Sequence, residues 1–308
     1  MNRFKTLLER EWMQHQRGFV IVMLAPSLLL LVAAMFGQVH LDLHSDGDTV
    51  VERVPDAGLM AVFAIAGLAV GTMLLAWLSA LFQAPGLARR DQQDRTIEFW
   101  MSLPLGHGKS VAATLLMHLV LMPWAALAIG LAGGLLVSVV FVARAWDVGA
   151  WFALPWASIM GVSLLFFARL MLGLLLCTLW LSPLILATMA ASAWLKRWGV
   201  PVVAAIIGGG GLMADKVYGS RVVWETLDTL FEHAGRALIG ADRAPGHGAI
   251  RIGPESQLTE MLPALPAWLL QDAGHAIVRL ASPAFMAAAL IGAAGFALLV
   301  LQRRRAAM

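Results

Sequence analysis

The sequence is poor in charged residues and in cysteine. Of its 308 residues only 13% are charged, whereas 60% are hydrophobic. Soluble domains carry charge on about a quarter of their residues, so this composition excludes an ordinary soluble globular protein. The single cysteine, Cys177, lies inside an apolar stretch, which excludes an intrachain disulfide framework and makes a cysteine-rich metal site implausible. The sequence also lacks internal repeats and low-complexity tracts.

Long apolar stretches dominate what is present, and they alternate with short polar segments. About 20 apolar residues are enough to cross a hydrocarbon core of ~30 Å. We therefore predict an all-α integral membrane protein in which residues 1–308 form a single transmembrane domain. The six predicted spans are 19–37, 57–85, 111–142, 170–194, 198–214 and 283–301.

Three further segments lie outside these spans. Residues 1–18 mix both charge signs and carry apolar residues at helical spacing, which predicts an in-plane amphipathic helix rather than a signal peptide; a solvated leader is the alternative. Residues 151–167 are interpreted as a re-entrant or interfacial piece, or as an overhang of the neighbouring spans. Residues 215–275 form a long polar segment with a helical stripe, which we expect outside the cytoplasm.

Lysine and arginine are distributed unevenly between the two sides of this layout. One side holds thirteen of them, while the two short loops on the other side hold only Arg53 and Arg144. The thirteen lie in residues 1–18, 89–110, 196–197 and 303–305. Because cytoplasmic loops carry the excess of basic residues, both termini and residues 89–110 are predicted to be cytoplasmic. The compartment expected is the inner (cytoplasmic) membrane.

The polar loop 89–110 contains a compact amphipathic segment, Arg95–Leu103. Asp94 is placed to cap the start of a helix, and Pro104 ends it by removing a backbone donor. The apolar residues of the segment fall on one face at helical spacing and leave Glu98 off that face. The pattern predicts an interfacial helix that presents its polar side to water.

This segment resembles the coupling helix of the ABC-2 type permeases, which are membrane subunits of one class of ATP-binding-cassette transporter. In that family the pattern is roughly R-x-T-x-E-F-L-x-S-L-P, and the helix rests on the ATPase subunit. The candidate coupling residues are Asp94, Arg95, Thr96, Glu98, Phe99, Trp100, Ser102 and Leu103. Arg95 stands where glycine is common, and Trp100 replaces an aliphatic residue. The motif covers only this segment, while the order of apolar stretches extends the likeness over most of the chain.

The resemblance implies the permease half of an exporter, with residues 1–18 as an elbow helix. It implies two partners besides the lipid bilayer: two copies of an ATPase subunit, and a second permease copy or homologue. ATP and Mg would bind the ATPase, so no cofactor, catalytic activity or nucleic-acid partner is expected on this chain. A plain cytoplasmic loop whose charges only set topology is the alternative for residues 89–110.

Two local patterns imitate ligand sites. Gly106-His-Gly-Lys-Ser110 resembles the end of a phosphate-binding loop, but such a loop needs a glycine at Leu103 and a strand before it. Residues 38–56 contain alternating His and Asp, yet the calcium-loop template fails because Arg53 occupies its last position. We therefore expect neither nucleotide nor metal to bind here.

A secondary transporter or channel is the competing function, and it would need ionisable residues at mid-membrane depth. Only Arg169 and His118 qualify in the predicted spans. We interpret Arg169 as an anchor at the outer interface in preference to a buried group, and His118 as a packing residue. A membrane enzyme would need a convergent acid, base or nucleophile set, which is absent. The stretch Gly208-Gly209-Gly210-Gly211 is either a hinge or a packing groove.

Overall fold

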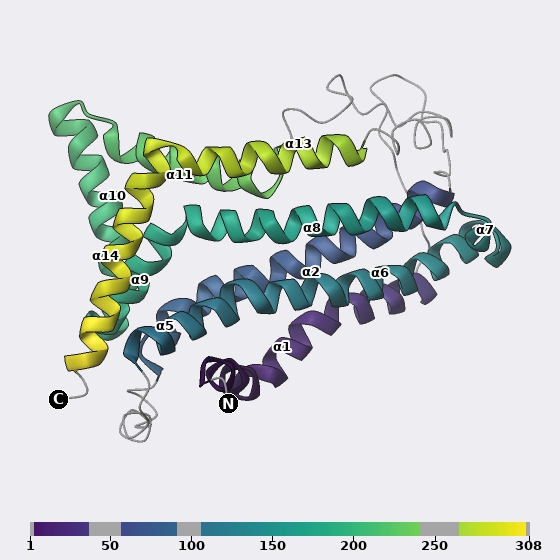
Figure 1. Ribbon diagram of the computed structural model, residues 1–308, viewed down its shortest axis with the longest axis horizontal. Helices are drawn as coiled ribbons and strands as arrows, with labels where there is room; N and C mark the ends of the chain where they lie inside the picture. The colour runs from purple at the N-terminus through teal and green to yellow at the C-terminus, as the bar shows by residue number, and fades with distance from the viewer. Residues whose placement is uncertain (1–2, 37–56, 91–105, 241–264, 306–308) are drawn as a thin grey trace.

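The computed structural model describes residues 3–36, 57–90, 106–240 and 265–305. Nearly all of these residues are helical and none of them is in a β-strand, so the all-α prediction is confirmed for this part of the chain (Figure 1). The elements are α1 (Arg3–Phe36), α2 (Ala57–Leu87), α5 (His107–Leu116), the π-helical η1 (Met117–Leu121), α6 (Met122–Ala145), α7 (Val148–Phe152), α8 (Trp156–Trp180), α9 (Ser182–Leu195), the 3-10 turn η2 (Lys196–Trp198), α10 (Gly199–Tyr218), α11 (Val222–Leu238), α13 (Leu265–Val278), the 3-10 turn η4 (Arg279–Ala281) and α14 (Pro283–Arg305).

Within the described residues, six helical stretches are long and apolar enough to cross a membrane. They are Phe4–Phe36, Ala57–Leu87, His107–Ala145, Trp156–Trp180, Ser182–Tyr218 and Pro283–Arg305. Their surfaces expose large apolar side chains, such as Leu29, Phe82 and Leu290, each at least 70% exposed. Apolar surface on this scale fits lipid better than water, so the chain has the character of a multi-pass membrane protein.

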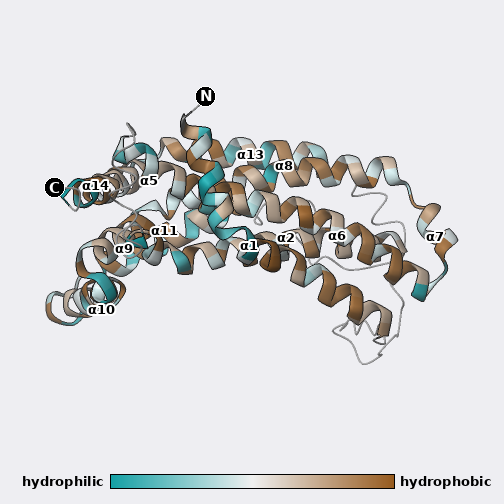
Figure 2. Ribbon diagram, turned by 90° about the horizontal axis from the view of Figure 1, so that it is seen from below, coloured by the Kyte–Doolittle hydropathy of each residue, from teal (hydrophilic) through white to brown (hydrophobic). Residues whose placement is uncertain are grey.

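The helices form two sets that run in different directions. Helices α2, α6 and α8 run lengthwise, with α11 and α13 along α8, while α9, α10 and α14 run across them at one end (Figure 1). The largest apolar core lies where the two sets meet, around the buried residues Trp77, Leu174, Trp180 and Leu186. Figure 2 shows apolar residues along α2, α6 and α8 and polar residues in the first turns of α1.

Helices α2 and α6 pack so closely that their contact requires glycine. A Cβ atom added at Gly134 would lie 2.7 Å from the Ile65 Cα, and one at Gly130 would lie 2.8 Å from the Ala69 Cα. Both obstacles are backbone atoms, which cannot swing aside. Small residues at such crossings are typical of membrane helices, because close backbone approach supplies the packing that lipid cannot.

A π-helical turn interrupts the third apolar stretch. The turn Met117–Leu121 lies just before Pro123, which is in the first turn of α6. Proline has no N–H, and its ring crowds the carbonyl four residues earlier, so a locally wider turn relieves the crowding. The stretch stays helical from His107 to Ala145 and is longer than the span predicted over 111–142.

Two predicted boundaries differ from the structure. The span predicted over 170–194 is divided at Leu181 between α8 and α9. Residues 156–167 belong to α8 itself, which agrees with the overhang alternative and not with a re-entrant or interfacial piece. Prolines are the physical reason: Pro155 precedes α8 and Pro183 lies in the first turn of α9, positions where proline favours the start of a new helix. Neither proline merely kinks one long span.

The predicted elbow helix is not a separate element. Helix α1 is continuous across the expected boundary between residues 18 and 19, although both figures show it changing direction along its length. Figure 1 also shows the two termini and the start of α5 along the same lower edge of the molecule. The in-plane orientation of residues 1–18 stays a prediction.

Candidate functional site

A buried group of polar side chains lies where four parts of the chain meet: α1, α5, η1 and the short segment that follows α2. Arg10, Glu11, Thr114 and His118 are each at most 8% exposed. Together with the partly buried His15 and Arg90, we call these residues the Glu11 cluster. Buried charged and polar groups are costly unless paired, so their gathering at one point requires specific contacts between the helices that carry them.

Glu11 is the centre of the cluster. Its Oε1 atom accepts hydrogen bonds from the Arg10 guanidinium at 2.8 Å, from Arg90 at 3.0 Å and from the Thr114 hydroxyl at 3.1 Å. Its Oε2 atom accepts a second bond from Arg90 at 3.1 Å. One carboxylate therefore connects α1 both to Arg90, just beyond the end of α2, and to Thr114 of α5, which is 103 residues away in sequence.

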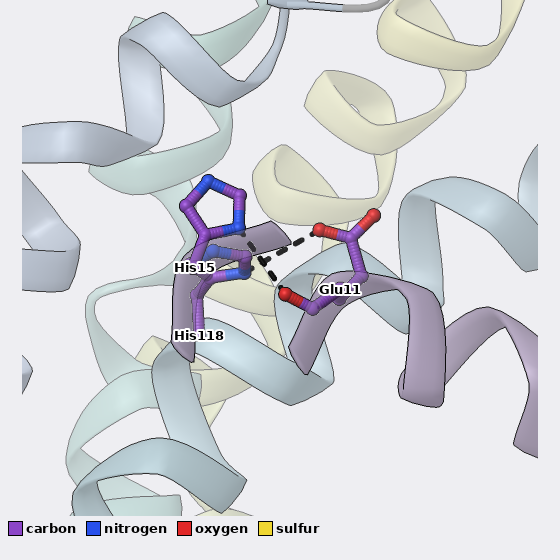
Figure 3. Close-up of side chains that lie close together, drawn as sticks. All are labelled: Glu11, His15 and His118. Atoms are coloured by element: carbon purple, nitrogen blue, oxygen red, sulfur yellow. Dashed lines mark hydrogen bonds and ion pairs between the residues drawn. The ribbon is translucent and has the colours of Figure 1, made fainter. Parts of the chain in front are cut away.

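Two histidine rings complete the cluster. The His15 ring contacts the Glu11 carbonyl through Nδ1 at 3.2 Å and the Arg90 guanidinium through Nε2 at 3.1 Å. Because arginine only donates, these contacts suit a His15 tautomer with its proton on Nδ1. The His118 Nδ1 atom lies 3.0 Å from the Thr114 carbonyl. The same atom lies 4.0 Å from Glu11 Oε2 (Figure 3). The two rings meet edge to face at 4.7 Å.

Glu11, His15 and His118 offer ligand atoms that lie within 4.8 Å of one another, as a metal site would require. The charge around them opposes a metal. The Arg90 guanidinium bonds both Glu11 carboxylate oxygens and the His15 ring, so a cation would have to compete with it for these atoms. A divalent ion would also lie beside two arginines, and like charges this close repel strongly. The donor set fits an arginine-neutralised network and does not fit a metal.

The Glu11 cluster includes residues from both sides of the predicted coupling segment. Arg90 is the last described residue before 91–105, and Thr114 lies in the second turn after His107. The candidate coupling residues themselves are outside the described part of the chain; they are Asp94, Arg95, Thr96, Glu98, Phe99, Trp100, Ser102 and Leu103. The structure therefore shows contacts of residues on either side of 91–105 and leaves the coupling helix a prediction.

Sequence reasoning missed Glu11, although a signal was present. Leu7, Glu11, His15 and Phe19 recur every four residues, so they share one face of a helix. Leu7 and Phe19 are buried, and a carboxylate between them on an apolar face needs a partner from elsewhere in the fold. His118 was expected to be a hydrogen-bonded packing residue, and its contact with the Thr114 carbonyl agrees.

The interpretation of Arg169 as an interfacial anchor is wrong. Its side chain is buried and contacts Asp272 of α13, with Nε donating to Oδ2 at 2.9 Å and the second nitrogen, Nη2, at 2.7 Å from the same oxygen. Its Nη1 atom donates to the Ala237 carbonyl at 3.0 Å. The reason is the position of α8: because this helix begins at Trp156, Arg169 falls near its middle rather than at an end.

The four consecutive glycines do not break their helix. Residues 208–211 lie inside α10, which continues to Tyr218. A Cβ at Gly211 would lie 3.0 Å from the Trp224 ring, so this glycine lets α11 pack against α10. Around Gly208, Gly209 and Gly210 an added Cβ would meet nothing within 4 Å. Packing therefore explains the last glycine of the four, and a hinge role for the others stays a hypothesis.

Three comparisons with known proteins found no relative of this chain. No protein-family model, curated protein or solved structure matches the chain. The likeness to ABC-2 type permeases consequently rests on the coupling segment and on the order of the apolar stretches.

Proposed function

We propose that this chain is the membrane-spanning subunit of an ABC-2 type transporter, an exporter driven by a separate ATPase subunit. The observation that carries the proposal is the match of Thr96, Glu98 and Phe99, with Ser102, Leu103 and Pro104, to the coupling pattern of that family. Six apolar helical stretches in the described residues support it. So does the placement of the coupling segment between the second and third of these stretches.

The Glu11 cluster supplies a physical route for the motion. A force that the ATPase subunit exerts on the coupling segment would be transmitted to the residues on either side of it, Arg90 and α5. Both are hydrogen-bonded to Glu11 of α1. Separating a buried carboxylate from its partners leaves an uncompensated charge, which typically costs about 3–5 kcal/mol. The three apolar stretches that begin or end at the cluster would therefore move together rather than independently.

The assembly that follows has two permease chains and two ATPase subunits in the cytoplasmic membrane. ATP and Mg bind the ATPase subunits, and this chain contributes the path across the bilayer. Both termini and residues 89–110 face the cytoplasm in this arrangement, as the distribution of Lys and Arg predicts.

The experiment is affinity purification of the full-length chain from its native membrane, followed by identification of copurifying proteins. We expect a Walker-type ATPase, whose recovery falls in Glu98→Ala and Phe99→Ala while the amount of inserted permease stays constant. Gln93→Ala, a polar change in the same loop outside the matched positions, is the control. Wild-type recovery in both Glu98→Ala and Phe99→Ala would reduce residues 89–110 to an ordinary loop.

A secondary transporter is the second candidate, and one observation favours it. Glu11 and His118 are ionisable, buried and 4.0 Å apart, and pairs of this kind serve in the proton relays of carriers. The two candidates differ in their energy source. In inverted vesicles, export appears as uptake into the lumen. Uptake that persists under a pH gradient without ATP would favour the secondary transporter, and uptake that requires ATP hydrolysis would favour the ABC-2 subunit.

A further inference from the structure

A pocket of about 280 Å³ lies on the side of α5 that faces away from the Glu11 cluster. Its walls come from α5, η1, α8, α9 and α14, and they include Ala112, Leu115, Leu119, Leu179, Leu186 and Phe296. Thr114 and His118, which belong to the Glu11 cluster, alternate along the same helix with the lining residues. One helix thus carries a charged network on one face and an apolar pocket on the other.

The walls expose only apolar atoms to the pocket. The hydroxyl of Thr178, a lining residue, already accepts a hydrogen bond from the Trp77 indole at 3.1 Å. Water needs two to four polar partners to remain in a cavity, and apolar cavities of about 150 Å³ stay dry and bind small hydrocarbons. A polar ligand group would lose its hydrogen bonds here without compensation. Walls of this kind favour a hydrocarbon as the occupant.

We propose that this pocket binds the terminal part of one hydrocarbon chain, such as an acyl chain. The pocket is larger than apolar cavities of about 150 Å³ that bind a small hydrocarbon such as benzene, so the end of a chain fits. A polar headgroup or a second chain would have to stay outside. All five elements that form the walls lie within stretches that can span a membrane, where such chains are the surrounding solvent.

Binding in a bilayer cannot depend on the hydrophobic effect, because the chain leaves one apolar environment for another. It depends on packing contacts, which are lost when a lining side chain grows into the space. The site and its test need no ATPase partner, so they stand apart from the proposed transport function.

The test uses the purified full-length chain in phosphatidylcholine nanodiscs that contain a trace of phosphatidylcholine with a diazirine near the end of one acyl chain. After illumination, labelled peptides are mapped by mass spectrometry. We expect saturable labelling of the peptides that contain Ala112 and Leu179, competed by decanol. Overpacking the site should weaken binding by about tenfold or more, so Ala112→Phe and Leu179→Trp should lose this labelling.

Leu164→Trp is the matched control, because Leu164 is an exposed residue of the same helix as Leu179 and does not line the pocket. It should keep the wild-type pattern. Decanol competition in the wild-type chain tests the proposal even where a variant fails to fold. Labelling that spreads evenly over exposed helices and does not saturate would overturn it. Crosslinks between the pocket residues and a second copy of the chain would also overturn the proposal, because that copy would then close the pocket.

The source of the chain is identified by the lipids that copurify with the protein. A phospholipid that is bound stoichiometrically and displaced by decanol would show that the bilayer supplies the chain. A different alkyl compound that behaves in the same way would show a dedicated ligand. Both results support a hydrocarbon-chain site, and the absence of any decanol-displaceable compound would count against it.

Discussion

Replacing either partner of the Arg169–Asp272 pair should destabilise the protein strongly. Asp272→Leu removes the carboxylate from the buried Arg169 guanidinium, which keeps its hydrogen bond to the Ala237 carbonyl. Arg169→Met leaves the Asp272 carboxylate with the Gly240 amide at 3.4 Å. Removing one partner of a buried pair typically costs about 3–5 kcal/mol, which is a hundredfold or more in the folding equilibrium.

The double variant Arg169→Met/Asp272→Leu should recover most of that loss. Both side chains are less than 10% exposed, so two apolar residues of similar volume remove both charges from an environment that penalises them. Such replacements are often neutral or stabilising by about 1–4 kcal/mol. The double-mutant cycle should therefore give a large coupling energy between the two positions.

An exposed pair provides the control. Arg236 and Glu232 on α11 lie 2.6 Å apart, closer than Arg169 and Asp272, but their side chains are 44% and 52% exposed. Solvent screening limits such helix pairs to about 0.3–0.5 kcal/mol. Both cycles can be measured by detergent-titrated unfolding in mixed micelles, followed by tryptophan fluorescence. A coupling energy for Arg169 and Asp272 as small as that of the exposed pair would refute the buried pairing of α8 with α13.

Three further outcomes are expected. In thermal denaturation in detergent, Gly134→Ala should lower the melting temperature because its Cβ would meet the α2 backbone, whereas Gly161→Ala, with open space around it, should be neutral or stabilising by up to about 1 kcal/mol. Glu11→Gln should reduce the yield of folded protein by leaving two arginines without their carboxylate, while Glu9→Gln, at an exposed position, should leave the yield unchanged. A cysteine at Gln93, in a variant without the native cysteine, should react with a membrane-impermeant thiol reagent only after permeabilisation, and labelling in intact cells would contradict the predicted orientation.

The length of the apolar stretches made the helical fold predictable. The boundaries of the helices depended on the surroundings of each proline. Apolar stretches of about 20 residues indicate spans regardless of how they pack, and the described residues contain six such stretches, although the fourth and fifth do not keep their predicted boundaries. Pro26 lies inside α1, whereas Pro183 starts a new helix. A proline is compatible with both outcomes, and the neighbouring helices select between them.

The candidate site was predictable only in part. The pattern of Arg95–Leu103 predicts a coupling helix, because cap, amphipathic face and terminal proline all lie within a dozen residues; these residues lie outside the described part of the chain, so the helix stays a prediction. The cluster that anchors it was not found, because Glu11, Arg90 and Thr114 are separated by as many as 103 residues. Arg169 was misplaced for a related reason: its partner Asp272 lies in a segment whose position against α8 has no local signal.

Composition and local spacing were enough to predict helical secondary structure, membrane-spanning length and the uneven distribution of basic residues. The tertiary structure decided which polar groups inside those helices are paired, where α8 gives way to α9, and which faces of α5 meet charge or an apolar pocket. The physical reason is that burial of a charge is tolerable only beside a partner. That partner is supplied by contacts between helices distant in sequence, which no local pattern records.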